Sequence, residues 1–128
     1  MGAQRTLLLG FSMGGAVAIA AADEPSVERV VGLAPWIPDR LPLDTLQGRR
    51  LDVLHGSLDR WLPGVPGVSP VLSRRGFERA RADGVLGSYE LIPGALHAIA
   101  LRSPSGRPVA LPRARAWADR VAAQLAGF

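Results

Sequence analysis

The chain has 128 residues, the length of a single domain over residues 1–128, and its lack of cysteine excludes disulfides, thiolate metal sites and a cysteine nucleophile. No apolar run approaches the ~20 residues of a membrane span and no cleavable leader precedes the first apolar segment, so we predict a cytoplasmic protein without a transmembrane helix. The net charge of +4 comes from 15 arginines, scattered along the chain, against 11 acidic residues, and this scatter predicts no specific nucleic-acid site.

Apolar runs in the first half of the chain predict three buried strands and one helix. Residues 6–9 form the first strand, and residues 13–22 form an alanine-rich helix that the following Asp-Glu-Pro sequence ends. Residues 27–33 form the second strand, and residues 34–48 form a loop with three prolines. The third strand follows at residues 51–55.

The second half of the chain predicts one more strand between two helices. A loop at 56–67 comes first, followed by a helix that Ser69 and Pro70 cap and that runs from about Ser73 to 83–84. A strand at 89–92, a turn-rich connection at 103–108 and a helix from Pro112 complete the chain. Helices between apolar strands are typical of a parallel sheet that is covered on both faces. We therefore predict an α/β fold, a three-layer sandwich whose mostly parallel sheet has about four strands.

A Gly-Phe-Ser-Met-Gly sequence follows the first strand and opens the first helix. The spacing G-x-S-x-G is typical of a nucleophile elbow, in which the serine projects from a sharp strand-to-helix turn. A serine hydroxyl is a poor nucleophile at neutral pH, and such a turn lets it meet a base and a substrate carbonyl together. We predict Ser12 as the nucleophile, and we expect Gly10 and Gly14 to leave the turn uncrowded.

Two histidines are candidates for the base that accepts the Ser12 proton. His55 lies inside the third strand, where a packed or hydrogen-bonded core histidine is the more frequent case. His97 follows the fourth strand on a loop, at the strand end that carries the ligand crevice in open α/β sheets. We therefore predict His97 as the base.

A carboxylate has to orient that base and stabilise its charged form. Asp59 directly follows the third strand, so it should reach the same edge of the sheet as the predicted nucleophile and base. Its alternative role is to cap a turn. Asp39, after the second strand, is the other candidate for the acid. The less well placed candidates are Asp44 and Asp52.

Three short sequences together resemble those of the α/β-hydrolase superfamily. Gly-Phe-Ser-Met-Gly-Gly resembles its elbow, Gly-Ser-Leu-Asp-Arg-Trp-Leu-Pro its acid loop and Gly-Ala-Leu-His its histidine loop, in the family's order of serine, acid and histidine. The resemblance runs from the family's fifth strand to its last helix. It therefore covers the C-terminal half of the family's fold, lacks the N-terminal strands and is closest to serine esterases, thioesterases and dienelactone hydrolases.

The resemblance implies a serine hydrolase that cleaves a carboxylic ester or thioester through an acyl-enzyme. By it, Ser12 is the nucleophile, His97 the general base and then acid, and Asp59 the orienting carboxylate. The Met13 N–H is one oxyanion donor. The family's other donor comes from a loop after its third strand, and losing one donor typically lowers the rate on the order of a hundred- to a thousand-fold.

Loop residues at the predicted edge suggest how a substrate would be held. Trp36, Trp61 and Leu62 are predicted to bind the acyl group, with simple packing as the alternative for the two tryptophans. The loop before residue 51 is too short for a cap domain, so we expect an open site and a small substrate. No metal and no organic cofactor is implied.

The strand at residues 6–9 would be central in the family's sheet, whereas here it is expected to be an unpaired apolar edge. One explanation is that the chain is a fragment of a longer enzyme, and this is the explanation that we expect. Another is a homodimer through the exposed residues Leu7, Leu8 and Leu9. The third is a truncated, non-catalytic module that acts by self-association or partner binding.

Overall fold

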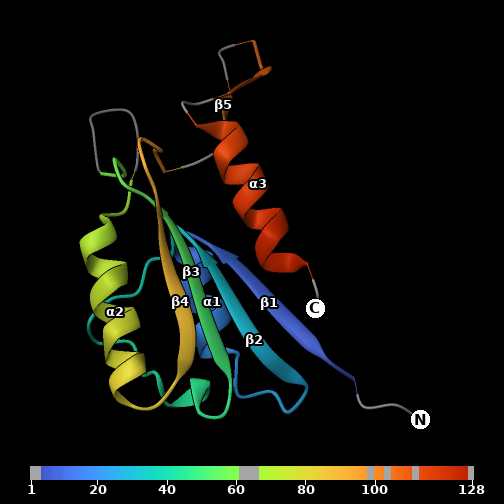
Figure 1. Cartoon of the computed structure of the whole chain (residues 1–128), viewed down its shortest axis with the longest axis vertical. Helices are drawn as coiled ribbons and strands as arrows, with labels where there is room; N and C mark the ends of the chain where they lie inside the picture. The colour runs from blue at the N-terminus through green and yellow to red at the C-terminus, as the bar shows by residue number, and fades with distance from the viewer. Residues whose placement is uncertain (1–3, 61–66, 98–99, 103–104, 111–112, 127–128) are drawn as a thin grey trace.

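A computed structural model describes residues 4–60, 67–97, 100–102, 105–110 and 113–126. Its main sheet contains four parallel strands in the order β1-β2-β3-β4 (Figure 1). The strands are β1 (Thr6–Phe11), β2 (Val27–Leu33), β3 (Arg50–Gly56) and β4 (Leu86–Ile92). The helices are α1 (Met13–Ala20), between β1 and β2, α2 (Pro70–Ala82), between β3 and β4, and α3 (Ala114–Leu125), near the C-terminus.

The predicted α/β class and the parallel sheet of four strands are confirmed. The second strand has the predicted bounds, whereas β4 begins at Leu86 rather than at residue 89. The sequence hides this start because Gly87 and Ser88 interrupt the apolar pattern. A Cβ atom at residue 87 would lie 1.6 Å from the carbonyl oxygen of Leu51, so glycine lets β4 lie against β3.

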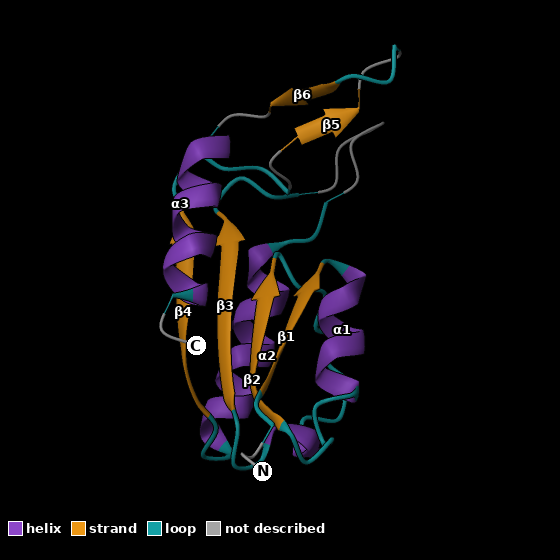
Figure 2. Ribbon diagram, turned by 90° about the vertical axis from the view of Figure 1, so that its right-hand side faces the viewer, coloured by secondary structure: helices purple, strands orange, loops and turns teal. Residues whose placement is uncertain are grey.

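Two short strands at the two ends of the predicted turn-rich connection were missed. β5 (Ala100–Arg102) and β6 (Pro108–Ala110) pair antiparallel on either side of that connection. Three residues are too few to show a periodic pattern, which explains the omission. Figure 2 shows this pair beyond the carboxyl ends of the four main strands. Pro112, the expected start of the last helix, lies outside the described residues.

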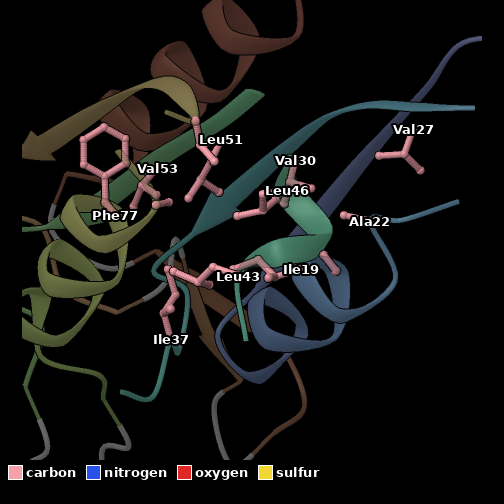
Figure 3. Packing of buried hydrophobic residues seen from close by; sticks show 13 residues of the cluster. Ile19, Ala22, Val27, Val30, Ile37, Leu43, Leu46, Leu51, Val53 and Phe77 are labelled. Carbon is pink, nitrogen blue, oxygen red and sulfur yellow. The ribbon is translucent and has the colours of Figure 1, made fainter. Parts of the chain in front are cut away.

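Helices cover both faces of the sheet, as the three-layer prediction requires. Ile19 of α1 and Phe77 of α2 pack with Val30 and Val53 in one buried cluster (Figure 3). A second cluster lies on the opposite face and contains Trp117 of α3, Leu54 of β3 and Ile92 of β4. Successive residues of a strand point to opposite faces, so β3 contributes to both clusters. No described helix has the length and apolar character needed to cross a membrane.

β1 forms one edge of the main sheet and leaves apolar side chains uncovered. Leu8 packs against the cluster that α1 and α2 cover. Leu9 and Phe11 are 48% and 47% exposed. They point to the face that carries α3, and α3 packs against the other half of that face, on β3. The expected apolar edge is therefore present.

Of the two glycines expected to leave the turn between β1 and α1 uncrowded, Gly10 and Gly14, only Gly10 has close neighbours. A Cβ atom at Gly10 would lie 2.3 Å from the carbonyl oxygen of Gly14. At Gly14 itself, a Cβ atom would meet nothing within 4 Å, so the prediction for this residue was wrong. Gly15 is the next crowded position, because a Cβ atom there would lie 2.4 Å from Cβ of Pro35, in the segment after β2.

A buried carboxylate joins three strands and α3. Asp52 on β3 accepts hydrogen bonds from Nε of Arg29 at 2.7 Å and from Nε of Arg50 at 2.9 Å, and Ser88 donates to it through its backbone N–H and its hydroxyl. Arg29 also donates to the backbone oxygen of Gln124. Burial raises the pKa of Asp52, but the hydrogen bonds from Arg50, Ser88 and Arg29 outweigh it and hold the pKa below its ordinary value.

The glycine contacts predict opposite effects for two matched substitutions. Gly10→Ala is expected to lower the free energy of unfolding by about 1–3 kcal/mol, because the added methyl group overlaps the backbone of α1. Gly14→Ala is the control, and it should leave this free energy unchanged or raise it by about 0.5–1 kcal/mol. Urea denaturation followed by circular dichroism measures both. Equal stabilities would contradict the close approach at Gly10.

Asp52 should make the stability of the fold depend on pH. Its pKa is lower in the folded chain than in the unfolded chain, so its ionised form stabilises the fold at neutral pH, and this contribution is lost as the pH falls through the folded-state pKa. Asp52→Asn is expected to lower the free energy of unfolding by roughly 3 kcal/mol at neutral pH and to flatten its decline in acid. Urea denaturation from neutral to acidic pH measures both effects. Parallel declines in the two proteins would argue against this role.

Candidate active site

Ser12 lies between β1 and α1 in a strained backbone conformation. Its φ angle of 55° is in the left-handed region, which costs a non-glycine residue on the order of 1–3 kcal/mol. Three backbone hydrogen bonds hold the residue there: its N–H donates to Leu33 at 3.0 Å, and its carbonyl accepts from Gly15 at 2.9 Å and from Trp36 at 2.8 Å. This strand-to-helix turn has the geometry expected of a nucleophile elbow.

The side chains of Ser12, His97 and Asp59 form a hydrogen-bonded series. Nε2 of His97 lies 3.1 Å from the Ser12 hydroxyl oxygen, and Nδ1 of His97 lies 2.6 Å from Oδ2 of Asp59. Because the carboxylate can only accept, Nδ1 carries the proton. Nε2 is then free to accept the hydrogen of the Ser12 hydroxyl. The ring of Phe11 packs beside the imidazole, with 5.0 Å between the ring centroids.

The loops that carry Asp59 and His97 are joined to each other. The backbone N–H of Ser57 donates to the carbonyl of Ile92 at 3.1 Å, and that of Leu58 donates to Ala95 at 2.9 Å. A Cβ atom at Gly56 would lie 2.4 Å from the carbonyl oxygen of Ala95, so only glycine permits this approach. The strand order therefore brings together two loops that are distant in sequence, and backbone contacts fix their spacing.

Asp59 is a buried carboxylate with three N–H donors. Oδ2 accepts from Nδ1 of His97 at 2.6 Å and from Nε2 of His55 at 2.9 Å, while Oδ1 accepts from the backbone of Val68 at 2.8 Å. Burial raises the pKa of Asp59, but the hydrogen bonds from His55, His97 and Val68 outweigh it and hold the pKa below its ordinary value. Asp59 is therefore ionised at neutral pH and can stabilise a positive charge on His97.

The structure also shows a contact that the sequence analysis missed. His55 is fully buried and hydrogen-bonded, as expected of a core histidine, but one of its partners is Asp59. The available signal was that His55 stands four residues before the predicted acid, near the end of the strand that leads into the acid's loop. Sequence spacing alone did not show that the chain turns back and places the two side chains together.

The other acidic candidates lie in different surroundings. Asp39 forms an exposed ion pair with Arg75. Asp52 on β3 is paired with Arg29 and Arg50, and Asp44 begins a short 3₁₀ helix (Asp44–Leu46). Among the carboxylates that the structure describes, Asp59 is the one that contacts His97. The geometry thus favours Asp59 over the alternatives as the partner of the predicted base.

The predicted oxyanion and substrate residues are placed only in part. Met13 is the first residue of α1, where backbone N–H groups have no partner within the helix. Trp36 is 39% exposed, and its backbone N–H holds the Ser12 carbonyl. Trp61 and Leu62 lie outside the described residues. The roles expected for these four residues stay predictions.

This geometry can activate an alcohol. An imidazole that receives a hydrogen bond from a serine hydroxyl can take its proton as the oxygen attacks an electrophile, and a carboxylate on the far side of the ring stabilises the imidazolium. The three side chains, which follow β1, β3 and β4, meet at the carboxyl edge of the parallel sheet. That edge is where ligands bind in open α/β sheets.

Comparisons with known proteins agree on the architecture. No protein-family model matches the sequence, and no curated protein matches it. Among solved structures, a putative dienelactone hydrolase from Klebsiella pneumoniae is similar with a TM-score of 0.66 and 18% identity, over 99% of this chain and 54% of the other. A carboxylesterase from Lactobacillus plantarum is similar with a TM-score of 0.65 and 15% identity, over 98% of this chain and 59% of the other. The esterase domain of a Rhodothermus marinus protein is similar with a TM-score of 0.56 and 22% identity, over 71% of this chain and 50% of the other.

These likenesses concern the fold. The chain spans about half the length of the solved structures that it resembles. Nearly the whole chain is nevertheless covered by the first two of them, including the sheet and the loops at its carboxyl edge. The four-stranded parallel sheet with its flanking helices thus shares its fold with the matched parts of these esterase and dienelactone hydrolase structures.

Proposed function

We propose that this chain carries the nucleophile, base and acid of a serine hydrolase that cleaves carboxylic esters or thioesters. The observation that carries the proposal is the hydrogen-bonded series from Ser12 through His97 to Asp59, which starts at a strained strand-to-helix turn. The solved structures that the chain resembles include a carboxylesterase, an esterase domain and a putative dienelactone hydrolase, and this supports the same class of reaction.

In the first half of the proposed reaction, the substrate acylates the enzyme. The Ser12 oxygen attacks the substrate carbonyl carbon while its proton moves to Nε2 of His97. The carbonyl oxygen becomes an oxyanion, which the Met13 N–H at the start of α1 stabilises. The tetrahedral intermediate then collapses, and His97 gives the proton to the departing alcohol or thiol. The product of this step is an acyl ester on Ser12.

In the second half, water replaces the alcohol. His97, again neutral at Nε2, takes a proton from a water molecule that attacks the acyl carbon. Collapse of the second tetrahedral intermediate returns that proton to the Ser12 oxygen and releases the carboxylic acid. Throughout the cycle, Asp59 holds the imidazole through Nδ1 and remains ionised, which its lowered pKa supports.

The surroundings of Ser12 support a small acyl substrate. Phe11 and Trp36 are partly exposed apolar side chains next to the reacting groups, one against the His97 ring and the other hydrogen-bonded through its backbone to Ser12. The segment between β2 and β3 contains only the short 3₁₀ helix, so no cap domain is inserted at that point of the chain. We assign Met13 to the proposed oxyanion hole, and Trp36, Trp61 and Leu62 to the proposed substrate-binding region.

The first test of this proposal is covalent labelling of Ser12. A fluorophosphonate probe should add once to the folded chain, as measured by intact mass, and Ser12→Ala should abolish the addition. His97→Ala should abolish it as well, because the hydroxyl loses its base. A folded chain that remains unlabelled would contradict the proposed activity of the chain on its own. Circular dichroism confirms that each variant is folded.

The acid is tested by a matched pair of substitutions. Asp59→Asn should lower the turnover of a p-nitrophenyl ester by about 10⁴-fold, because an amide that donates to His97 selects the wrong tautomer. Asp39→Asn alters an exposed carboxylate that is paired with Arg75 and should leave turnover unchanged. The reverse result would identify Asp39 as the acid and refute the assignment of Asp59.

One observation favours a second candidate function, which is self-association. β1 is an edge strand, and its side chains Leu9 and Phe11 are about half exposed, so a second copy can pair with the strand at Leu7, Leu8 and Leu9. A chain that acts by association should sediment as a dimer, and Leu9→Lys should make it monomeric without unfolding it. Ser12→Ala should keep the assembly. A monomeric wild-type chain would exclude this function.

A further inference from the structure

His55 makes contacts that go beyond packing. Its side chain is fully buried, and Nε2 lies 2.9 Å from Oδ2 of Asp59 and 2.8 Å from the carbonyl oxygen of Val68. Both partners can only accept, so Nε2 carries the proton and donates it between them. The backbone N–H of the same Val68 donates to Oδ1 of Asp59. His55 and Val68 therefore hold the carboxylate from two sides.

The other nitrogen of His55 is the acceptor end of a short polar series. Nδ1 lies 2.7 Å from the Ser73 hydroxyl oxygen, which lies 2.7 Å from the Tyr89 hydroxyl oxygen. In the neutral imidazole, whose proton is on Nε2, Nδ1 accepts from Ser73. The Tyr89 hydroxyl then donates toward the Ser73 oxygen and toward the carbonyl oxygen of Pro70, which lies 2.9 Å from the Tyr89 oxygen and 3.1 Å from the Ser73 oxygen. Burial raises the pKa of Tyr89, so its hydroxyl keeps the proton that it donates. Donation from Ser73 to Nδ1 reinforces the tautomer of His55 that carries its proton on Nε2.

We propose that His55 is a positioning residue, which acts through Asp59 and is itself oriented by Ser73 and Tyr89. Its Nε2–H fixes the carboxylate so that Oδ2 meets Nδ1 of His97 at 2.6 Å. The part of this inference that concerns turnover rests on the proposed function. His55 touches neither Ser12 nor the space where a substrate would lie, so it should affect catalysis and not binding.

The surroundings of His55 argue against a role in packing alone. Buried polar side chains are costly unless all their groups are paired, and an apolar side chain of similar size would avoid that cost. Here the hydroxyls of Ser73 on α2 and Tyr89 on β4 are linked through His55 to one carboxylate, that of Asp59. The other buried acid that the structure describes, Asp52 on β3, is instead held by two arginines and lies toward the opposite end of that strand.

Two substitutions at His55 separate positioning from packing. His55→Leu fills the space but removes the donor, and it should lower kcat for a p-nitrophenyl ester by about 10–100-fold with KM unchanged, by analogy with residues that orient metal ligands. His55→Gln can present an amide N–H to Asp59 and should recover most of kcat. The rate of fluorophosphonate labelling should follow kcat. Urea denaturation gives the folded fraction of each variant.

A spectroscopic readout makes the test independent of turnover. The proton on Nδ1 of His97, held against Asp59, should give a downfield resonance in the proton NMR spectrum, assigned by its loss in His97→Ala. His55→Leu should broaden or shift it, and His55→Gln should restore it. If the wild-type chain shows the resonance and this dependence on His55 but does not label with fluorophosphonate, the proposed function fails while the positioning role stands.

A milder matched pair covers the case in which His55→Leu does not fold. Ser73→Ala removes one hydrogen bond to buried His55, and Ser88→Ala removes one to buried Asp52 on the same strand. Ser73→Ala should lower kcat, or disturb the resonance, by an amount that matches the loss of one hydrogen bond, about threefold to tenfold in rate. Ser88→Ala should change neither. Equal behaviour of this pair, or a folded His55→Leu protein with wild-type kcat and resonance, overturns the inference.

Discussion

The arrangement of this site depends on one buried charge, the carboxylate of Asp59. An ionised group without partners would be too costly in the interior, and the carboxyl would take up a proton instead. Three N–H donors from His55, His97 and Val68 prevent that outcome. The same donors fix the orientation of the carboxylate. The three donors therefore set both the charge and the orientation of the carboxylate. An ionised carboxylate that faces Nδ1 of His97 in turn keeps the proton of the imidazole on Nδ1.

The rest of the carboxyl edge holds Ser12 at the correct distance from that charge. The strained φ angle of Ser12 persists because β2, the segment after it and α1 each hydrogen-bond to its backbone. On the other side, Gly56 lets the loop after β3 contact the loop after β4. The serine and its base thus belong to loops fixed by backbone contacts, so their 3.1 Å separation depends on the sheet and not on one flexible side chain.

The sequence predicted what depends on local patterns and missed what depends on contacts between distant segments. Runs of apolar residues located the strands, and glycine spacing located the turn at Ser12. The start of β4 was missed because Gly87 and Ser88 break the apolar pattern, although the glycine is what allows close strand contact. Gly14 was expected to relieve crowding, whereas Gly10 and Gly15 do so, because the neighbouring atoms come from α1 and Pro35. The contact of His55 with Asp59 likewise needs the three-dimensional turn after β3.

The exposed apolar side of β1 lies next to the proposed base. Leu9 and Phe11 are about half exposed on the face where α3 covers only β3 and its neighbourhood. Phe11 also packs against the ring of His97. A polypeptide that covered this side of β1 would bury Phe11 and exclude water from one face of the imidazole, which strengthens its electrostatic interaction with Asp59. The exposed apolar edge at β1 and the surroundings of the proposed base therefore share one side chain, Phe11.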